Sequence, residues 1–484
     1  MKFSQLASPT WALLLSQAAA KPFAEATIDI DVDVAIIGGG SAGTYAAIQL
    51  KDAGASVAIV EKKEQNGGHA NTYTNPRTKL PVNVGVAIFE NREIVSNYFS
   101  RLNVSTIQAN PVTGPRTVPV KAYDFSLGIA IPAQNASATA AQQQAVKAAA
   151  QAYSTNVLSK YTWLDEGFLL PERVPEELTI PFAEFAQKYN FTALLPIIVQ
   201  LNWWTGDIAT IPALYGIKGF GPGLFKSYFG EFILSANGDT RALYDAAAKD
   251  LGDSVLLNAT VIEVKRNVKI DKETTAPVNV LVQQPGQPQK LIRARKLLIA
   301  IPPVLANVAN YDLSAHERSL FSKLFSLGYW TGVATIPGMK NITLANVGVQ
   351  TPFNQPVIPG SNSFGYSGSP GDFVFAVGFQ EANHTAKETE AIIKKELATL
   401  AAIGAVPKDA AQNVTFPYVS DHSPYNNRCT PEEIKQGYYR KLLALEGERN
   451  TYWAGATFSG HNSALVWSFI EGTVLPALKK DLGL

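Results

Sequence analysis

The feature that most constrains this chain is the glycine-rich stretch AIIGGGSAGTYAA at residues 35–47. An apolar run typical of a buried strand leads into G-x-G-x-x-G, formed by Gly38, Gly40 and Gly43, and a run with helical spacing follows. The first glycine allows a tight turn, the second lets the backbone approach a pyrophosphate, and the third lets helix and strand pack closely. The stretch therefore predicts a strand, a phosphate-binding turn and a helix that begin an α/β fold with a parallel sheet.

The next segment indicates which dinucleotide is bound. Residues 56–63 (SVAIVEKK) predict a second strand, and Glu61 follows Gly43 by eighteen positions. A carboxylate there can accept hydrogen bonds from ribose hydroxyls and disfavours the 2′-phosphate of NADP. The pair Gly67–Gly68 and a strand that ends near Gly85 come next, where a nicotinamide enzyme would continue into another βαβ unit. FAD needs close backbone approach along its ribityl chain and ring, so these extra glycines favour FAD.

The rest of the chain predicts an interrupted domain. Residues 28–110, 225–310 and 445–484 are expected to form a discontinuous Rossmann-type FAD-binding domain with a parallel sheet and a β-meander. Residues 111–224 and 311–444 are expected to form a mixed α+β substrate-binding domain. Within it, the alanine-rich segment 136–153 predicts a helix. The apolar stretch 191–204 predicts either a buried helix or an apolar wall of a substrate pocket.

Composition excludes several function classes. The 484 residues carry a net charge of +1, and no block of like charge occurs, which argues against nucleic acid as a partner. Cys429 is the only cysteine, so intramolecular disulfides and cysteine metal clusters are excluded. The five histidines lack metal-ligand spacing, and we expect no metal. After the N-terminal segment, no apolar run is long enough to predict a transmembrane helix in the mature chain.

The N-terminus predicts a secretory signal peptide. Lys2 precedes a short apolar core, and small residues at 18–20 resemble a cleavage site, although Pro9 interrupts the segment. We therefore expect residues 1–20 to be removed and the protein to be secreted or delivered to a luminal compartment. The chain also contains sequons for N-glycosylation, which fit this route. Their asparagines are Asn103, Asn135, Asn190, Asn258, Asn341, Asn383 and Asn413.

Taken together, these segments resemble the flavin-containing amine oxidase superfamily, within the glutathione-reductase-type FAD enzymes. The resemblance rests on residues 34–73, on VNVGVAIF, LLNATVIEV and ARKLLIAIPP, and on residues 451–478. It covers nearly the whole mature chain. It is strongest to fungal enzymes of the β-cyclopiazonate dehydrogenase kind, and polyunsaturated fatty acid isomerases share the layout.

The resemblance implies a set of FAD contacts. Residues 67–69 would lie near the pyrophosphate and ribityl chain, residues 85–87 near the ring, and Val261 against adenine. A helix start near Phe469–Ile470 would point N–H groups at the flavin N1/O2 edge, where a helix dipole stabilises negative charge. The implied cofactor-binding residues are Gly38, Gly40, Ser41, Ala42, Gly43, Glu61, Lys62, Gly67, Gly68, His69, Gly85, Val86, Ala87, Val261, Gly455, Ala456, Phe469 and Ile470.

Three departures from the family weaken the case for amine oxidation. Many amine oxidases have arginine where this chain has His69. Thr331–Gly332 occupies the region where many of them hold a lysine against the flavin, and Ala456–Thr457 replaces a common acidic residue. The glycine motifs and Glu61 still support FAD binding.

The resulting hypothesis is an FAD-dependent oxidoreductase that abstracts hydride from a hydrophobic small molecule, such as a fungal-type secondary metabolite, by dehydrogenation or oxidative cyclisation. Two alternatives stay open: a redox-neutral isomerase of an unsaturated lipid, and a non-catalytic GDI-like prenyl-binding module. The candidate catalytic residues are His461 as a base, and Tyr425 and Trp330 as aromatic groups that stabilise a cation. Ordinary core packing is the favoured interpretation of Tyr425 and Trp330, and His461 also fits a plain hydrogen-bonding role. The substrate, electron acceptor and oligomeric state are left open.

Overall fold

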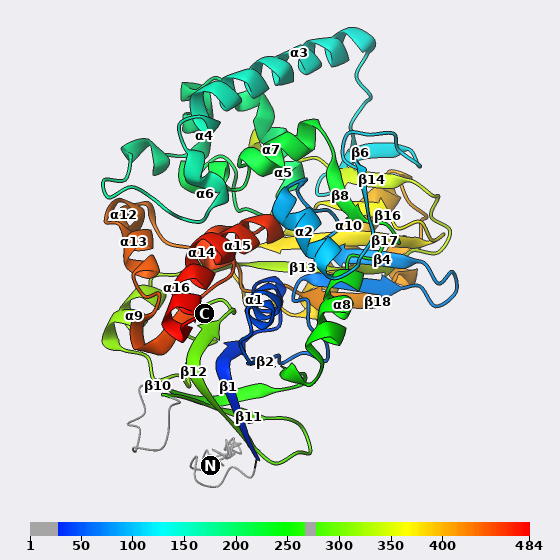
Figure 1. The fold of residues 1–484 in the computed structure, drawn as a ribbon. Coiled ribbons are helices and arrows are strands. Elements are labelled where there is room, and N and C mark those ends of the chain that lie inside the picture. Colours follow the sequence, from blue (N-terminus) through cyan, green and yellow to red (C-terminus); the bar gives the residue numbers. More distant parts are fainter. Residues whose placement is uncertain (1–27, 267–276) are drawn as a thin grey trace, which may run out of the picture.

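The computed structural model describes residues 28–266 and 277–484, so the predicted signal peptide lies outside the described residues. The described residues form two large sheets, each with its own covering helices, and a further layer of helices (Figure 1). The C-terminal helices lie beside the first helix near the centre of the molecule, although they are far apart in sequence. The first and the last helices of the described chain thus build one region.

The first sheet has seven strands in the order β10-β11-β12-β1-β2-β9, with β20 added beside β12. Strand β1 pairs in parallel with both β12 and β2, and its residues 34–37 are buried. A parallel strand covered on both faces needs an apolar run, which explains why VAII precedes the glycines. The strands are β1 (Ile28–Ile37), β2 (Val57–Val60), β9 (Val255–Leu256), β10 (Thr260–Arg266), β11 (Val278–Gln283), β12 (Lys290–Ile299) and β20 (Thr451–Trp453).

The second sheet has nine strands in the order β18-β13-β17-β16-β14-β6-β7, with β15 and β19 paired at its side. Its strands are β6 (Val120–Asp124), β7 (Ile129–Ala130), β13 (Phe325–Thr335), β14 (Thr343–Asn346), β15 (Gly360–Ser361), β16 (Ser363–Tyr366), β17 (Asp372–Phe379), β18 (Thr415–Asp421) and β19 (Tyr425–Arg428). Two small antiparallel sheets of two strands complete the strands: β3 (Ala70–Thr74) with β4 (Pro81–Gly85), and β5 (Thr106–Ala109) with the sequence-distant β8 (Phe232–Ser235).

The helices fall into three groups. Helix α1 packs on the first sheet with the C-terminal helices, α3 to α7 form a separate layer, and α10 covers the second sheet (Figure 1). Their bounds are α1 (Ser41–Asp52), α2 (Glu93–Arg101), α3 (Ala136–Tyr153), α4 (Phe182–Lys188), α5 (Leu195–Leu201), α6 (Ala213–Lys218), α7 (Pro222–Phe229), α8 (Ala242–Leu251), α9 (Ala315–Phe321), α10 (Ala386–Ala402), α11 (Ala410–Asn413), α12 (Pro431–Lys435), α13 (Tyr438–Leu443), α14 (Ala456–Ser459), α15 (Ser463–Phe469) and α16 (Leu475–Leu482).

The predicted fold class is confirmed. The parallel β1–α1–β2 unit, the meander β10-β11-β12 and the helix at 136–153 are all present. Strands of the second sheet come from both segments assigned to the substrate-binding domain, while the exact domain bounds stay a prediction. Within residues 28–266 and 277–484, no helix combines the length and the apolar character needed to cross a membrane.

Candidate active site

The glycine turn after β1 is packed as its spacing predicts. Gly38 has φ +102°, and a Cβ atom there would lie 2.6 Å from Cγ2 of Ile301. A Cβ atom on Gly43 would lie 1.9 Å from the Gly38 carbonyl oxygen. The first glycine therefore permits the turn, and the third lets α1 approach the strand, because no side chain fits at either position.

Glu61 and the second glycine pair close around this turn. The buried Glu61 carboxylate accepts hydrogen bonds from the Gly39 N–H at 2.7 Å and the Lys63 N–H at 2.8 Å. The Gly67 N–H donates to the Gly39 carbonyl at 2.7 Å, and a Cβ atom on Gly68 would lie 3.0 Å from the Gly40 Cα atom. Segments 38–43 and 61–68 thus form one cradle of backbone groups and one carboxylate.

The N-terminus of α1 fits an anionic phosphate ligand. Gly40 is the N-cap residue. Among the described residues, no side chain caps this helix, and its first turn contains no acidic residue. The N–H groups of this turn and the positive end of the helix dipole are suited to a diphosphate. The C-terminal segment reaches the same place, since the Trp467 Nε1–H donates to Ser41 Oγ at 3.0 Å. Ser41 and Ala42 of the predicted set belong to this turn.

The remaining predicted cofactor residues lie around the cradle. The Val86 N–H donates to the His69 carbonyl at 3.2 Å, which joins residues 85–87 to the second glycine pair. The Ala259 N–H donates to the Glu61 carbonyl, so β10 and its Val261 start beside Glu61. Gly455 has φ +111° with open space around its Cα atom, and Ala456 follows it as the first residue of α14. The side chain of Lys62 is exposed.

One predicted feature is wrong: no helix starts at Phe469–Ile470. Helix α15 begins at Ser463, with Asn462 as its cap, and continues through a π-helical turn at Ile470–Val474 into α16. The Ile470 N–H is used inside the helix, where it donates to Val466 and Trp467 carbonyls. The helix begins earlier because the Asn462 side chain accepts from the Ala464 N–H at 2.8 Å.

A cluster of imidazole and phenol rings lies beside the cradle. His69 stacks on His422 with ring centroids 4.3 Å apart, and His461 lies 4.2 Å from the ring of Tyr425. Tyr329 also stacks on Tyr425, with ring centroids 4.6 Å apart. Burial lowers the pKa of His69 to about 4 and that of His461 to about 3, and it lowers the pKa of His422 well below its usual value. The three imidazoles are therefore neutral at pH 7.

The position of His461 is set by an unusual hydrogen bond. Its Nε2 atom accepts from the Asn426 N–H at 2.9 Å, so this nitrogen is unprotonated and the other carries the hydrogen. Burial raises the pKa of Tyr425 to about 12, which keeps the phenol neutral. The structure brings Tyr425 and His461 together. It does not bring Trp330 to them, because Trp330 packs in the core of the second sheet.

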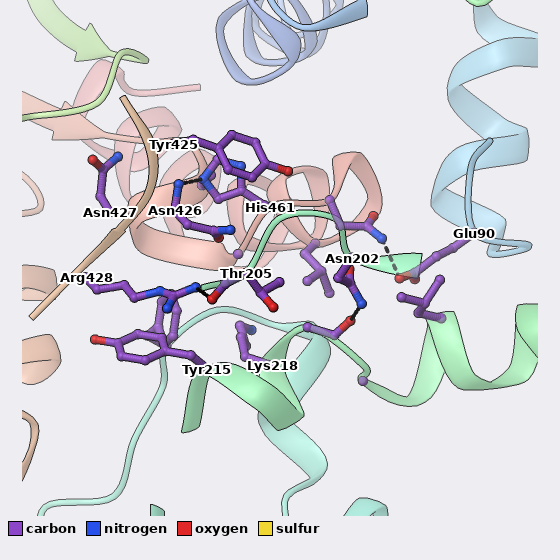
Figure 2. Close-up of a pocket in the computed structure, with 18 residues that line it drawn as sticks. Glu90, Asn202, Thr205, Tyr215, Lys218, Tyr425, Asn426, Asn427, Arg428 and His461 are labelled. Carbon is purple, nitrogen blue, oxygen red and sulfur yellow. Dashed lines mark hydrogen bonds between the residues drawn. The ribbon is translucent and has the colours of Figure 1, made fainter. Parts of the chain in front are cut away.

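Tyr425 and His461 line a cavity of about 50 Å³ (Figure 2). Ala456 lines it too, which joins the cavity to the predicted cofactor residues. Three charged residues that the sequence analysis missed also line it: Glu90, Lys218 and Arg428. They come from a loop, from α6 and from β19, and no motif marks them. The other lining residues are Phe168, Asn202, Thr205, Tyr215, Gly219, Gly221, Leu224, Asn426, Asn427, Gly460, Asn462 and Leu465.

The charged residues differ in how they are held. Glu90 accepts from Asn462 Nδ2 at 2.8 Å, and burial together with the charge of Asp165 raises its pKa. The Lys218 ammonium donates to the Leu164 and Gly167 carbonyls, and burial lowers its pKa to about 7. The Arg428 guanidinium donates to the Thr205 carbonyl. Figure 2 shows Arg428 and Glu90 on opposite sides of the cavity, with the neutral rings of Tyr425 and His461 on one side between them and Lys218 on the other.

Cys429 lies behind the cavity wall. It is fully buried, its N–H donates to the Tyr215 hydroxyl at 3.0 Å, and burial raises the pKa of its thiol to about 12. A thiol with such a pKa is protonated at neutral pH and is a poor nucleophile.

Comparison with known proteins places this geometry among flavoproteins. A family model described as NAD(P)-binding Rossmann-like domain matches residues 36–102. FAD-dependent oxidoreductase dpchF of Colletotrichum higginsianum is 60% identical over 485 residues, which span 100% of both chains. Beta-cyclopiazonate dehydrogenase of Aspergillus oryzae is 32% identical over 445 residues, which cover 91% of this chain and 92% of that protein. The predicted resemblance and FAD as cofactor are confirmed.

Solved structures extend the likeness at the level of the fold. A CLA-producing fatty acid isomerase from P. acnes matches with a TM-score of 0.71 and 19% identity, over 92% of this chain and 98% of its own. Wild-type putrescine oxidase bound to putrescine matches with a TM-score of 0.59 and 15% identity, over 94% and 99%. At these identities the matches show the shared fold alone, which is the predicted amine-oxidase type.

Proposed function

Because this chain belongs to the family of FAD-dependent oxidoreductases represented by its 60% identical relative, we propose that it dehydrogenates a hydrophobic small molecule of the secondary-metabolite kind. Desaturation and oxidative ring closure both begin with loss of hydride from an activated carbon. The observation that carries the proposal is the cavity that joins Ala456 of the predicted cofactor site to the neutral rings of Tyr425 and His461.

The residues of the cradle fit FAD. The first turn of α1 would hold the diphosphate, Glu61 a ribose, and the segments at Gly67–Gly68 and Gly455–Ala456 the ribityl chain. When bound, FAD supplies a two-electron acceptor. The protein's own contribution is to bind and orient the substrate and to exclude water.

The cluster of imidazole and phenol rings is suited to binding and orienting an apolar substrate. Neutral imidazoles and phenols present little charge to an apolar substrate, and their π faces stabilise positive charge that develops on a carbon. The nitrogen of His461 that accepts from the Asn426 N–H is already engaged. A proton released by the substrate would therefore have to reach another acceptor. We assign this role to Glu90, whose Oε2 atom is buried, has no hydrogen-bond partner among the described residues and lies 3.7 Å from the Arg92 guanidinium. Burial raises the pKa of Glu90 to about 8, which makes its ionised form an effective base.

The experiment that tests the proposal uses purified holoprotein and a panel of apolar fungal metabolites under anaerobic conditions. Bleaching of the flavin absorbance together with a product that has lost two hydrogen atoms supports dehydrogenation. A product of unchanged mass supports the isomerase alternative instead. Protein that binds lipid but cannot be reconstituted with FAD would contradict both and support a GDI-like binding role.

We also propose that the protein enters the secretory pathway. The asparagines of all seven sequons are exposed in the structure, which supports access by a glycosyl transferase. Expression in a eukaryotic host should yield a protein that lacks residues 1–20 and shifts in mass after treatment with an N-glycosidase. An unshifted mass with an intact N-terminus would contradict this proposal.

A further inference from the structure

Arg428 is a buried cation without a carboxylate partner in the part of the chain that the structure describes. Its side chain lies at the cavity wall, and only 5% of the residue is exposed. Among the described residues, the guanidinium makes one hydrogen bond, to the Thr205 carbonyl, and its carbon lies 5.0 Å from the centroid of the Tyr215 ring. Figure 2 shows the guanidinium directed at Thr205, with the Tyr215 side chain beside it.

Arg266 shows how this protein treats an arginine that is equally buried. Arg266 is 4% exposed, and its guanidinium is paired with Asp312 at 2.7 Å and with Glu317 at 2.6 Å. A buried charge is unfavourable unless an opposite charge and hydrogen bonds compensate it. Asp312 and Glu317 compensate the charge of Arg266, whereas no described carboxylate compensates the charge of Arg428.

Neighbouring groups do not neutralise Arg428. Burial lowers the pKa of Arg428 to about 10, and the ionisable groups that oppose this shift are the phenols of Tyr215, Tyr439 and Tyr425. These phenols are neutral at pH 7, whereas Arg428 keeps its proton. Lys218, the other cation of the cavity, differs because the charges of Asp165 and Glu90 both favour its protonated form. The uncompensated positive charge therefore lies at the Arg428 end.

We propose that Arg428 binds an anionic oxygen of the substrate, a carboxylate or an enolate, and so places the apolar remainder beside Tyr425 and His461. The planar guanidinium can donate two parallel hydrogen bonds to such a group. A cavity of about 50 Å³ has room for a head group of a few atoms. This inference rests on the proposed function, because it names the chemical class of the substrate of that site.

The test compares a carboxylate with its neutral amide on the holoenzyme. Sodium hexanoate and hexanamide are titrated by calorimetry into wild-type protein, and into the Arg428→Gln and Arg428→Lys variants. Wild type is expected to bind hexanoate at least about tenfold more tightly than hexanamide. Arg428→Gln, which can still donate to Thr205, is expected to lose this preference, and Arg428→Lys to keep part of it. Arg440→Gln serves as the control, because Arg440 is an exposed arginine paired with Glu172.

Three results would overturn the inference. One is equal binding of acid and amide to wild type, or no binding of hexanoate. A second is a preference for the acid that survives in Arg428→Gln. A third is a folded Arg428→Lys variant without any preference, which is decisive where the Gln variant does not fold. If the anionic partner were FAD itself, Arg428→Gln would lose flavin and the wild-type holoenzyme would not bind hexanoate. Flavin content and turnover in the same samples test the proposed function separately from this inference.

Discussion

The glycine cradle and the Arg428 cavity are built in opposite ways. The cradle is made of backbone groups from two short segments, and it depends on the absence of side chains at Gly38 and Gly43. The cavity is made of side chains from α6, β19 and several loops, and its character depends on their charge. The cradle is consequently sensitive to added volume, whereas the cavity is sensitive to changes of ionisation.

The largest effect is expected from added volume in the cradle. Gly43→Val should destabilise the protein by about 3 kcal/mol or more and abolish FAD retention, because the new Cβ atom would overlap the Gly38 carbonyl oxygen. Flavin content after desalting and urea unfolding measure the two effects. Gly365→Ala is the matched control, since its Cβ atom would lie at an ordinary 3.6 Å from the Val374 carbonyl oxygen. Full flavin content in Gly43→Val would contradict the packing argument.

A smaller effect is expected when the pH is lowered, because the buried histidines of the ring cluster resist protonation. The folded-state pKa values of His69 and His461, about 4 and about 3, lie below the ordinary value of 6.5. The unfolded chain therefore binds more protons below pH 6.5, and stability falls as pH falls toward the folded-state values. Between pH 7 and pH 5, the titration of each histidine should lower the free energy of unfolding by about 2 kcal/mol.

Urea unfolding at the two pH values measures this loss. His461→Gln should reduce the difference in stability between pH 7 and pH 5 by about 2 kcal/mol. The same substitution at the exposed His316 should leave the wild-type difference in place. An unchanged pH dependence in His461→Gln would show that this imidazole is not held neutral by burial.

The smallest effect is expected from a change of charge in the cradle that keeps its volume. Glu61→Gln should raise the Kd for FAD about tenfold, because the neutral amide is a weaker acceptor for ribose hydroxyls. Fluorescence titration of apoprotein with FAD gives the value, and the exposed Glu64→Gln should match wild type. An unaltered Kd in Glu61→Gln would place the ribose elsewhere.

The contrast also explains which parts of the protein could be predicted. The β1–α1–β2 unit, Glu61 and the pair at Gly67–Gly68 follow from local backbone requirements, so their spacing alone places them. Phe469–Ile470 was misplaced as a helix start because the Asn462 cap, several residues earlier, decides where α15 begins. Trp330 was grouped with Tyr425 by residue type, yet the pleat of β13 directs it into the core of the second sheet.

The sequence by itself determined the strand, the turn and the helix that form the phosphate cradle, and through them the fold class and the cofactor. Only the tertiary structure decided that Arg428, Lys218 and Glu90 meet in one cavity, and that three histidines distant in sequence stack in one cluster. The physical reason is the distance along the chain over which each feature is specified. A glycine turn is specified by neighbours along the chain, whereas burial, charge compensation and pKa depend on residues hundreds of positions away.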